Sequence, residues 1–333
     1  MNDVISTIPE LQACVGVAGL PVKMKIIDHL DEAAARWIAA SPLAFVGIGG
    51  ADGPRVRLAG GSAGFARAKS KAVLSLPLAA VDAPGEVAAG QGAGVLFLIP
   101  GVGETLRANG RISAVTGEAL EIAVEECFVH CAKALIRSDF WTPTDATAPA
   151  GAAAFVDGAR FLALATMDRE GRIDISPKGD PAGLLIRMEG DRAVLAERPG
   201  NRLAFGYRNM VEQPQVAALC LIPGVAAAAE LRGRAVLTTD ETLRARFVVE
   251  TKTPILATVI EGAAASLAPS EALARAAVWA APPAASDVDP SATLVAHVKL
   301  NKARGAEATM LRLAVNRGLV AKGLEASYRD GLY

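Results

Sequence analysis

Phe97-Leu-Ile-Pro-Gly101 returns later in the chain as Cys220-Leu-Ile-Pro-Gly224, and this repeated stretch decides the fold. Gly110-Arg111 returns at the same spacing, as Gly233-Arg234. A register that is shared at two separate places indicates an internal repeat, which changes the interpretation of the whole chain. We therefore interpret the sequence as two diverged copies of one domain.

Further matches extend the repeat in both directions. Upstream, the segment 37–48 (WIAASPLAFVGI) parallels 155–166 (FVDGARFLALAT). Downstream, an arginine and a tryptophan recur at one spacing, as Arg137 with Trp141 and as Arg275 with Trp279. The offset changes between these matches, which indicates insertions in loops. Two domains also agree with a length of 333 residues, because a single core usually stops growing before that length.

The repeat sets the expected domain boundaries. We expect a first copy at residues 1–141, a linker at 142–150 and a second copy at 151–280. The linker contains Thr142-Pro-Thr-Asp-Ala-Thr-Ala-Pro149, whose small residues and prolines are typical of a connection. Residues 281–333 have no counterpart in the first copy, and the pattern from about 303 to 322 predicts a helical extension.

Short strands dominate the pattern within each copy. In the second copy we predict strands at 159–167, 172–176, 193–197, 215–223 and 229–239, with one helix at 202–212. Many short strands with few helices are typical of a barrel. The predicted fold class is therefore mainly β with helices (α+β).

Composition excludes several classes of protein. Hydrophobic residues make up 52% and charged residues 21%, with a net charge of −1, so we expect neither a disordered chain nor a nucleic-acid binder. No apolar run approaches the ~20 residues needed to span a membrane. The N-terminal segment lacks a basic start before an apolar run, and the four cysteines do not suggest a disulfide framework, so we expect a cytoplasmic protein.

The segment around His130 invites a metal interpretation because Cys127 and Cys131 flank it. The chain has only three histidines and no second cysteine pair, so we expect no metal site. On a helix, the two thiols would lie on one face as small buried hydrophobic groups. Gly101-Val-Gly103 is not a phosphate loop either, because no Lys-Ser or Lys-Thr follows it.

Several motifs of the second copy together resemble one family, the pyridoxamine 5'-phosphate oxidase-related FMN-binding split β-barrels. These motifs are Ser176-Pro-Lys-Gly-Asp-Pro181, Arg198-Pro-Gly-Asn-Arg202, Asn209, Leu221-Ile-Pro-Gly224 and Leu231-Arg-Gly-Arg234. The segment 127–141 resembles the end of the barrel in one subgroup, and the resemblance extends from about residue 28 to residue 280, once per copy. The Arg-rich substrate signature of true pyridoxamine 5'-phosphate oxidases is absent, so we do not expect vitamin B6 activity.

The resemblance implies dimers that hold FMN at the subunit interface. Here it implies two tandem split barrels that form an intramolecular pseudo-dimer, so that the whole chain can be a monomer. By position it assigns Lys178, Asn201 and Arg202 to the FMN phosphate, with Ser176 and Gly200 lining the approach. An arginine fork and a second cation suit a dianionic phosphate. Arg198 and Arg208 are expected at the surface.

The two copies differ in complementary places. The first copy reads Arg57–Ser62 and Leu76–Ala80 where the second has its phosphate motifs, and it lacks their lysine and Asn-Arg pair. Conversely, the first copy has His130-Cys-Ala-Lys-Ala-Leu-Ile-Arg-Ser138, whereas the second has Glu271 in place of Lys133. In a two-fold dimer each site takes walls from both subunits, so we predict one shared site to which the first copy contributes His130, Lys133 and Arg137.

The resemblance implies an FMN-dependent oxidoreductase that passes electrons from reduced nicotinamide, NAD(P)H, to a small-molecule acceptor. The flavin would carry the redox chemistry and the protein would position it. No side chain stands out as a catalytic acid or base. The alternatives are a non-catalytic flavin carrier and a split barrel that binds haem or a deazaflavin.

Overall fold

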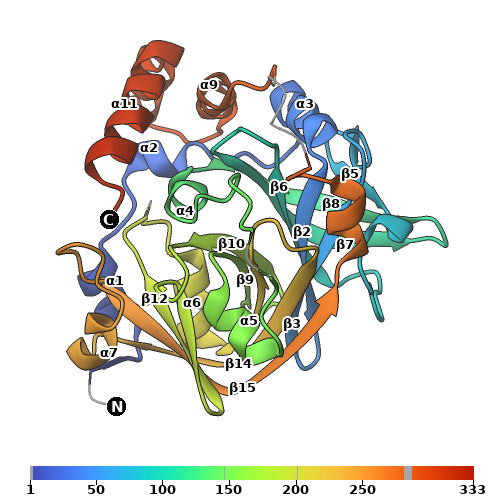
Figure 1. The fold of residues 1–333 in the computed structure, drawn as a ribbon. Helices are drawn as coiled ribbons and strands as arrows, with labels where there is room; N and C mark the ends of the chain where they lie inside the picture. Colours follow the sequence, from blue (N-terminus) through green and yellow to red (C-terminus); the bar gives the residue numbers. More distant parts are fainter. Residues whose placement is uncertain (1–2, 146, 201, 281–286) are drawn as a thin grey trace.

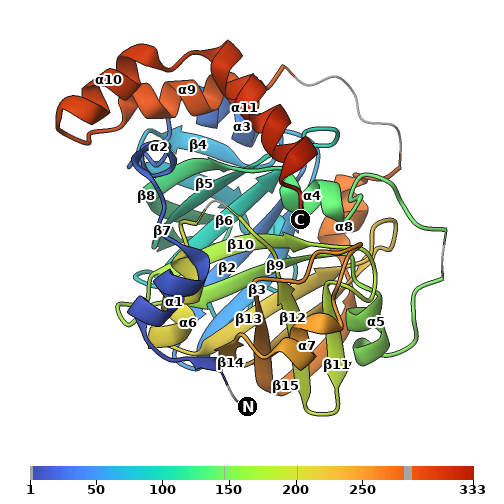
Figure 2. The same cartoon turned by 90° about the vertical axis from the view of Figure 1, so that its left-hand side faces the viewer.

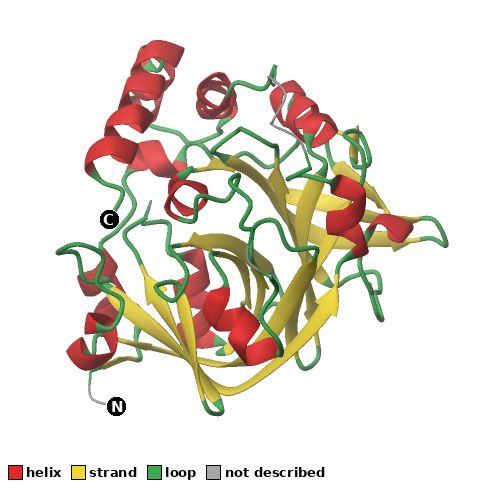
Figure 3. Cartoon of the chain, in the orientation of Figure 1, coloured by secondary structure: helices red, strands yellow, loops and turns green. Residues whose placement is uncertain are grey.

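The computed structural model describes residues 3–145, 147–200, 202–280 and 287–333. It shows an α+β protein, as the sequence predicted, and its strands form two antiparallel sheets (Figures 1 and 3). The first sheet contains β2 (Leu43–Gly50), β3 (Gly53–Gly60), β4 (Arg67–Ser70), β5 (Val73–Pro77), β6 (Gly92–Leu98), β7 (Thr105–Val115) and β8 (Ala119–His130). The second contains β9 (Phe161–Met167), β10 (Ile173–Gly179), β11 (Ile186–Glu189), β12 (Arg192–Glu197), β13 (Gln215–Leu221), β14 (Ala227–Thr238) and β15 (Leu256–Pro269).

The strands of the two sheets follow one order. The first sheet runs β3-β2-β6-β7-β8-β5-β4, and the second runs β10-β9-β13-β14-β15-β12-β11, with β1 (Val4–Ile5) added beside β14. Both orders are the same when each sheet's own strands are numbered along the chain. The Leu-Ile-Pro-Gly stretches close β6 and β13, at corresponding places in the two sheets.

The repeated glycines mark a bulge in each sheet. The register shifts between Asn109 and Gly110 in β7, and between Arg232 and Arg234 in β14. A Cβ atom on Gly110 would lie 1.9 Å from the carbonyl oxygen of Ala123, and one on Gly233 would lie 2.6 Å from that of Glu261. Only glycine allows this close approach of neighbouring strands.

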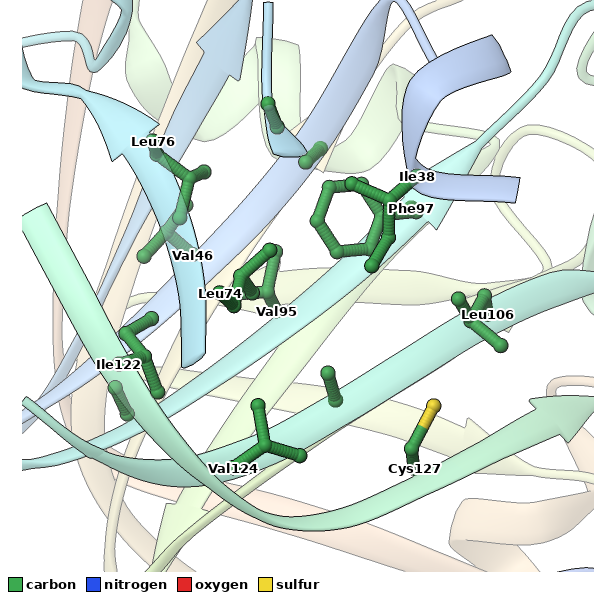
Figure 4. Close-up of a cluster of buried hydrophobic side chains, with 14 of the residues drawn as sticks. Ile38, Val46, Leu74, Leu76, Val95, Phe97, Leu106, Ile122, Val124 and Cys127 are labelled. Atoms are coloured by element: carbon green, nitrogen blue, oxygen red, sulfur yellow. The ribbon is translucent and has the colours of Figure 1, made fainter. Parts of the chain in front are cut away.

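The three largest hydrophobic clusters of the described residues lie in and between the two sheets. One lies inside the first sheet (Figure 4), one lies inside the second, and a third contains residues of both sheets. Strand β2 shows the division, because Val46 faces the first core and its neighbour Phe45 faces the third. In the third core the rings of Phe45 and Phe161 lie 5.6 Å apart. Burial on both faces explains why β2 and β9 are continuous apolar runs without polar alternation.

Two short helices each follow the last strand of one sheet and pack against the other sheet. Helix α4 (Lys133–Arg137) follows β8 and packs on β10, and α8 (Glu271–Ala276) follows β15 and packs on β3. A Cβ atom on Gly179 would lie 1.9 Å from the carbonyl oxygen of Ala134, and one on Gly60 would lie 2.3 Å from that of Ala272. Each glycine therefore lets the helix of one half approach the other half.

The remaining helices lie outside the sheets. They are α1 (Ile8–Val15), α2 (Leu20–Lys23), α3 (Glu32–Ala40), the 3₁₀ turn η1 (Leu78–Ala80), α5 (Ala152–Gly158), α6 (Phe205–Glu212), α7 (Glu241–Ala245), α9 (Pro290–Leu300), α10 (Ala306–Ala314) and α11 (Arg317–Asp330). The last three form the helical extension, which crosses the edge of the first sheet and returns towards α4 (Figure 2). The buried His297 of α9 anchors this extension through contacts with the Lys25 carbonyl at 3.2 Å and the Asp31 carboxylate at 3.4 Å.

Two details differ from the sequence-based expectations. Cys127 and His130 lie in β8 and not on a helix, so the argument about a shared helix face does not apply; Cys127 points into the first core. The N-terminal residues pack with the second half, because β1 pairs with β14 and Leu11 and Val15 enter the second core. All four cysteines are free thiols.

Among the described residues, no helix is long and apolar enough to cross a membrane.

Candidate functional site

A cavity of about 330 Å³ lies between the two halves of the chain. Its polar wall comes from β8 and α4 of the first half and from β10 and the loop after β12 of the second. The structure brings together seven of the residues that the sequence singled out: His130, Lys133, Arg137, Ser176, Lys178, Gly200 and Arg202. Asn201, the eighth, lies outside the described residues. The rest of the wall includes an apolar group, namely Val15, Leu164, Leu185, Met210 and Ile255.

Lys178 lines the cavity, and its ammonium group pairs with a carboxylate of the protein. Its ammonium group contacts the carboxylate of Glu197, which is completely buried, and lies 3.3 Å from the hydroxyl of Tyr207. The Tyr207 hydroxyl donates to Glu197 at 2.7 Å, and Thr258 donates to the same carboxylate at 2.8 Å. Burial and the negative charge of Glu197 raise the pKa of Tyr207 well above its usual value. The positive charge of Lys178 is therefore balanced within the protein.

Arg198 connects two motifs of the second half, the one at 198–202 in which it stands and the one at 176–181. Its guanidinium group donates to the Asp180 carboxylate at 2.7 Å, and both side chains are almost fully buried. It also donates to the backbone carbonyl of Phe247 at 2.8 Å. The expectation that Arg198 lies at the surface was wrong, because the buried Asp180 requires a partner. Arg208 is exposed, as expected.

Arg202 presents a positive charge that no carboxylate of the described residues balances. Its side chain is exposed, and its backbone has φ of 61°, a left-handed conformation that aims it across the loop towards Gly16. No ion pair or side-chain hydrogen bond engages its guanidinium group within the described part of the chain. A residue in this conformation requires support from its surroundings, which is common at ligand sites.

The two cations of α4 face the second half. Arg137 donates to the carbonyl oxygen of Pro199 at 3.1 Å, so it touches the loop that carries Gly200 and Arg202. No carboxylate pairs with Lys133 or Arg137 within the described residues. Both also donate hydrogen bonds to backbone carbonyl oxygens near the end of the chain. Burial lowers the pKa of Lys133.

His130 supplies a neutral imidazole at the cavity. Its Nδ1 atom is buried and has no hydrogen-bond partner among the described residues. Burial, with the nearby charges of Arg107, Lys25 and Lys178, holds the pKa of His130 well below its usual value. The imidazole can therefore accept a hydrogen bond or a ligand through a free nitrogen.

A buried ion pair closes the far side of the cavity. Arg107 of β7 contacts the Asp174 carboxylate of β10 at 2.9 Å and donates to the carbonyl oxygen of Ile175 at 2.6 Å. Beyond Asp174 and Phe205 lies a second cavity of about 470 Å³, which also borders both halves. The pair thus separates two neighbouring spaces at the boundary between the halves.

The corresponding region on the other side of the molecule is different. There Asp82 accepts a hydrogen bond from the backbone N–H of Ala272 at 2.8 Å and pairs with Arg275 at 3.7 Å. Arg275 also donates to the carbonyl oxygens of Gly60 and Ala80, and the exposed Glu271 carboxylate lies 3.6 Å from its guanidinium group. A carboxylate of the protein itself therefore neutralises Arg275, whereas no carboxylate neutralises Arg137 within the described residues.

Several residues of the site were missed by the sequence interpretation. Glu197 and Tyr207 were overlooked because their contact with Lys178 depends on how β12 and α6 close against β10. Asp180 had a signal, since it stands in the Lys-Gly-Asp motif and Arg198 stands in the Arg-Pro-Gly motif. Trp141 and Trp279 are partly buried against the third core and do not line the cavity.

The described residues contain no group of three or more His, Cys, Asp and Glu side chains that could hold a metal ion.

Comparisons with known proteins give a family match for the second half. Residues 149–289 match the model of the family described as pyridoxamine 5'-phosphate oxidase. This match confirms a pyridoxamine 5'-phosphate oxidase-like split-barrel region in that part of the chain. A search of curated proteins finds no match.

Similar solved structures share little sequence with the chain. An F420 reductase is 16% identical over 36% of this chain and 98% of its own, with a TM-score of 0.28. General Stress Protein 26 from Bacillus anthracis is 16% identical over 32% of this chain and 81% of its own, with a TM-score of 0.26. HutZ, the haem storage protein from Vibrio cholerae, is 15% identical over 33% of this chain and 86% of its own, with a TM-score of 0.21.

Proposed function

We propose that the chain is an FMN-dependent oxidoreductase built from two tandem split barrels that form an intramolecular pseudo-dimer. The equal strand order of the two sheets, their crosswise helices and the core between them support the duplication. The family match of residues 149–289 supports a flavin as the cofactor. One observation carries the proposal most directly, namely that cations from both halves line a single cavity without carboxylate partners among the described residues.

The charges of the cavity fit the phosphate of FMN. Lys133 and Arg137 from the first half and Arg202 from the second have no acidic partner among the described residues, so their charges are available to a dianion. Lys178 is balanced by Glu197, and we therefore propose that it closes the wall and orients Tyr207 and does not bind the phosphate directly. The main contacts with the phosphate are therefore assigned to Lys133 and Arg137 of α4 and not to Lys178.

The apolar part of the cavity suits a planar ring system. Leu164, Leu185 and Met210 belong to the second core, and Val15 of α1 completes this wall from the N-terminal segment. When bound there, FMN would supply hydride and electron transfer between a reduced nicotinamide and a small acceptor. The protein would bind and orient the flavin and exclude water, and His130 would offer a hydrogen-bond acceptor.

The neutral His130 supports a second candidate function. An unprotonated imidazole beside cationic side chains could ligate the iron of haem while the cations hold its carboxylates. Absorbance of the purified protein separates the candidates. FMN gives bands near ~450 nm and haem gives a Soret band, because each cofactor has its own chromophore. A haem spectrum after loading with both cofactors would contradict the flavin proposal.

Enzyme activity requires a separate test. Anaerobic mixing with NADH or NADPH should bleach the flavin bands of the loaded protein, since hydride transfer reduces the isoalloxazine ring. A protein that binds FMN but is reduced by neither nucleotide would be a flavin carrier or would use another donor, and the oxidoreductase proposal for reduced nicotinamide would fail.

A further inference from the structure

The last residues of the chain contact Lys133 and Arg137, the two cations of α4 that have no carboxylate partner among the described residues. Lys133 donates from Nζ to the carbonyl oxygen of Gly331. Arg137 donates to the carbonyl oxygen of Leu332 from Nε at 2.6 Å and again from Nη2. Figure 2 shows this end of the chain beside α4. Two backbone carbonyls therefore occupy hydrogen-bond donors that an anion at α4 would need.

An aromatic ring covers the same place. The Tyr333 ring centroid lies 5.4 Å from the guanidinium carbon of Arg137 and 5.2 Å from that of Arg198. Contacts of this kind between a guanidinium group and a ring are favourable but weaker than a charge-assisted hydrogen bond to an anion. The ring thus lies over the two arginines without balancing their charge.

The segment is anchored by Tyr328. Its hydroxyl donates to the buried Glu104 carboxylate at 2.7 Å and accepts from the backbone N–H of Ala132 at 3.1 Å, immediately before α4. Helix α11 contributes no buried residue, and Leu319 is 62% exposed. Segments that are held by polar contacts with little buried apolar surface open at low free-energy cost.

We propose that Tyr328–Tyr333 is a displaceable strap, which binds Lys133 and Arg137 in the absence of ligand and is released when an anionic group binds to them. A phosphate carries full negative charge, whereas the strap offers only carbonyl dipoles. The phosphate therefore binds Lys133 and Arg137 more strongly and displaces the strap. The idea rests on the proposed function only in naming a phosphate-bearing ligand, because any phosphate that reaches α4 would compete.

Hydrogen exchange of the full chain tests the release. The rate is followed at the amides of residues 328–333 with no addition, with FMN and with inorganic phosphate. Displacement predicts faster exchange at these amides with either ligand, while the amides of α9 keep their rates. Slower exchange with ligand would mean that the segment closes over the bound group, and unchanged rates would mean that it does not respond; both results overturn the proposal.

Variants of the anchor test the competition. Tyr328→Phe removes both hydroxyl contacts and should tighten the binding of inorganic phosphate and FMN by at least roughly 2- to 10-fold, because each hydrogen bond lost from the competing state contributes about that factor. Tyr333→Ala should act in the same direction. Met310→Ala is the control in the same extension, since Met310 is 70% exposed, and it should leave both affinities unchanged.

Measuring both phosphate and FMN binding distinguishes failure of the strap proposal from failure of the flavin proposal. Tighter phosphate binding by Tyr328→Phe supports the strap even if the protein takes no FMN. Unchanged affinities in Tyr328→Phe and Tyr333→Ala overturn the strap while leaving FMN binding intact. A wild-type chain that binds neither FMN nor phosphate overturns it as well.

Discussion

Arg107 of β7 and Asp174 of β10 form a buried ion pair of 2.9 Å that joins the two halves of the chain. On the other side of the molecule, Glu230 of β14 pairs with Arg57 of β3 at 2.8 Å. Arg107 and Glu230 stand at the same distance before the bulge glycines of their strands, so the charge is reversed at equivalent positions. On each side of the molecule, an ion pair therefore joins the first half to the second.

Arg107→Ala should strongly destabilise the fold. It leaves Asp174 buried without its cation, and breaking a buried pair in this way typically costs ~3–5 kcal/mol. Urea unfolding of the variant measures the loss. Arg172→Ala is the matched control because its partner Asp168 is on the same turn and Arg172 is 58% exposed, so its loss should stay within about 1 kcal/mol. Equal losses in the two variants would show that the Arg107 pair is not a main connection between the halves.

Lys178 and Arg202 should separate into a structural and a binding role. Lys178→Met leaves Glu197 buried without a cation, so unfolding free energy should fall by ~3–5 kcal/mol, and the added change Glu197→Gln should recover part of it. Arg202→Ala should keep the fold but weaken FMN binding by about 10- to 150-fold, as expected for a charge-assisted hydrogen bond. Flavin titration and urea unfolding of both variants measure the two effects. Unchanged FMN affinity in Arg202→Ala would remove Arg202 from the site.

His130 should make the fold sensitive to acid. Its pKa is lowered in the folded protein, and the unfolded chain has the ordinary value near ~6.5, so below that pH the unfolded state binds the additional proton. Unfolding free energy should therefore fall by about 1.4 kcal/mol per pH unit between the unfolded and the folded pKa. His130→Asn should lose this part of the dependence in urea unfolding from pH 7 to pH 5. Parallel curves for the two proteins would mean that His130 titrates normally.

One FMN should bind per chain. The cavity beside α4 is lined by Lys133, Arg137 and Arg202, which have no carboxylate partner among the described residues, whereas Asp82 pairs with Arg275, the corresponding arginine of α8. Quantitative release of flavin from the loaded protein, together with a protein assay, gives the ratio. Two equivalents would show that the region around Arg57 and Arg275 still binds flavin, and the argument from complementary loss would fail.

Much of the architecture could be predicted because the same sequence motifs occur in both halves of the chain. The Leu-Ile-Pro-Gly stretches and the glycines 110 and 233 fix strand ends and bulges, which are local features with a clear sequence signal. The last strand, β15, was missed because its Gly-Ala-Ala-Ala-Ser stretch at 262–266 shows no apolar alternation. The helix expected around Cys127 is a strand, since pairing with β7 decides this segment and local propensity does not.

The candidate site was predictable only in its outline. Motifs of the two halves pointed to Lys133, Arg137 and Arg202, and the structure places them around one cavity. The pairing of Lys178 with Glu197 could not be predicted, because it depends on the closure of one barrel in three dimensions. Contacts with Gly331 and Leu332 join residues that lie far apart in sequence through backbone atoms, which leave no pattern of side chains.

The central claim is that one FMN site is shared by the two halves, and matched arginines test it most directly. Arg137 and Arg275 occupy corresponding positions in α4 and α8, and both donate to backbone carbonyls, but no carboxylate neutralises Arg137 among the described residues. FMN is titrated into Arg137→Ala and Arg275→Ala, both shown to be folded. A shared site predicts that Arg137→Ala binds FMN about 10- to 150-fold more weakly than the wild type, while Arg275→Ala stays within a factor of about 2. Equal affinities in the two variants would contradict a site to which the first half contributes.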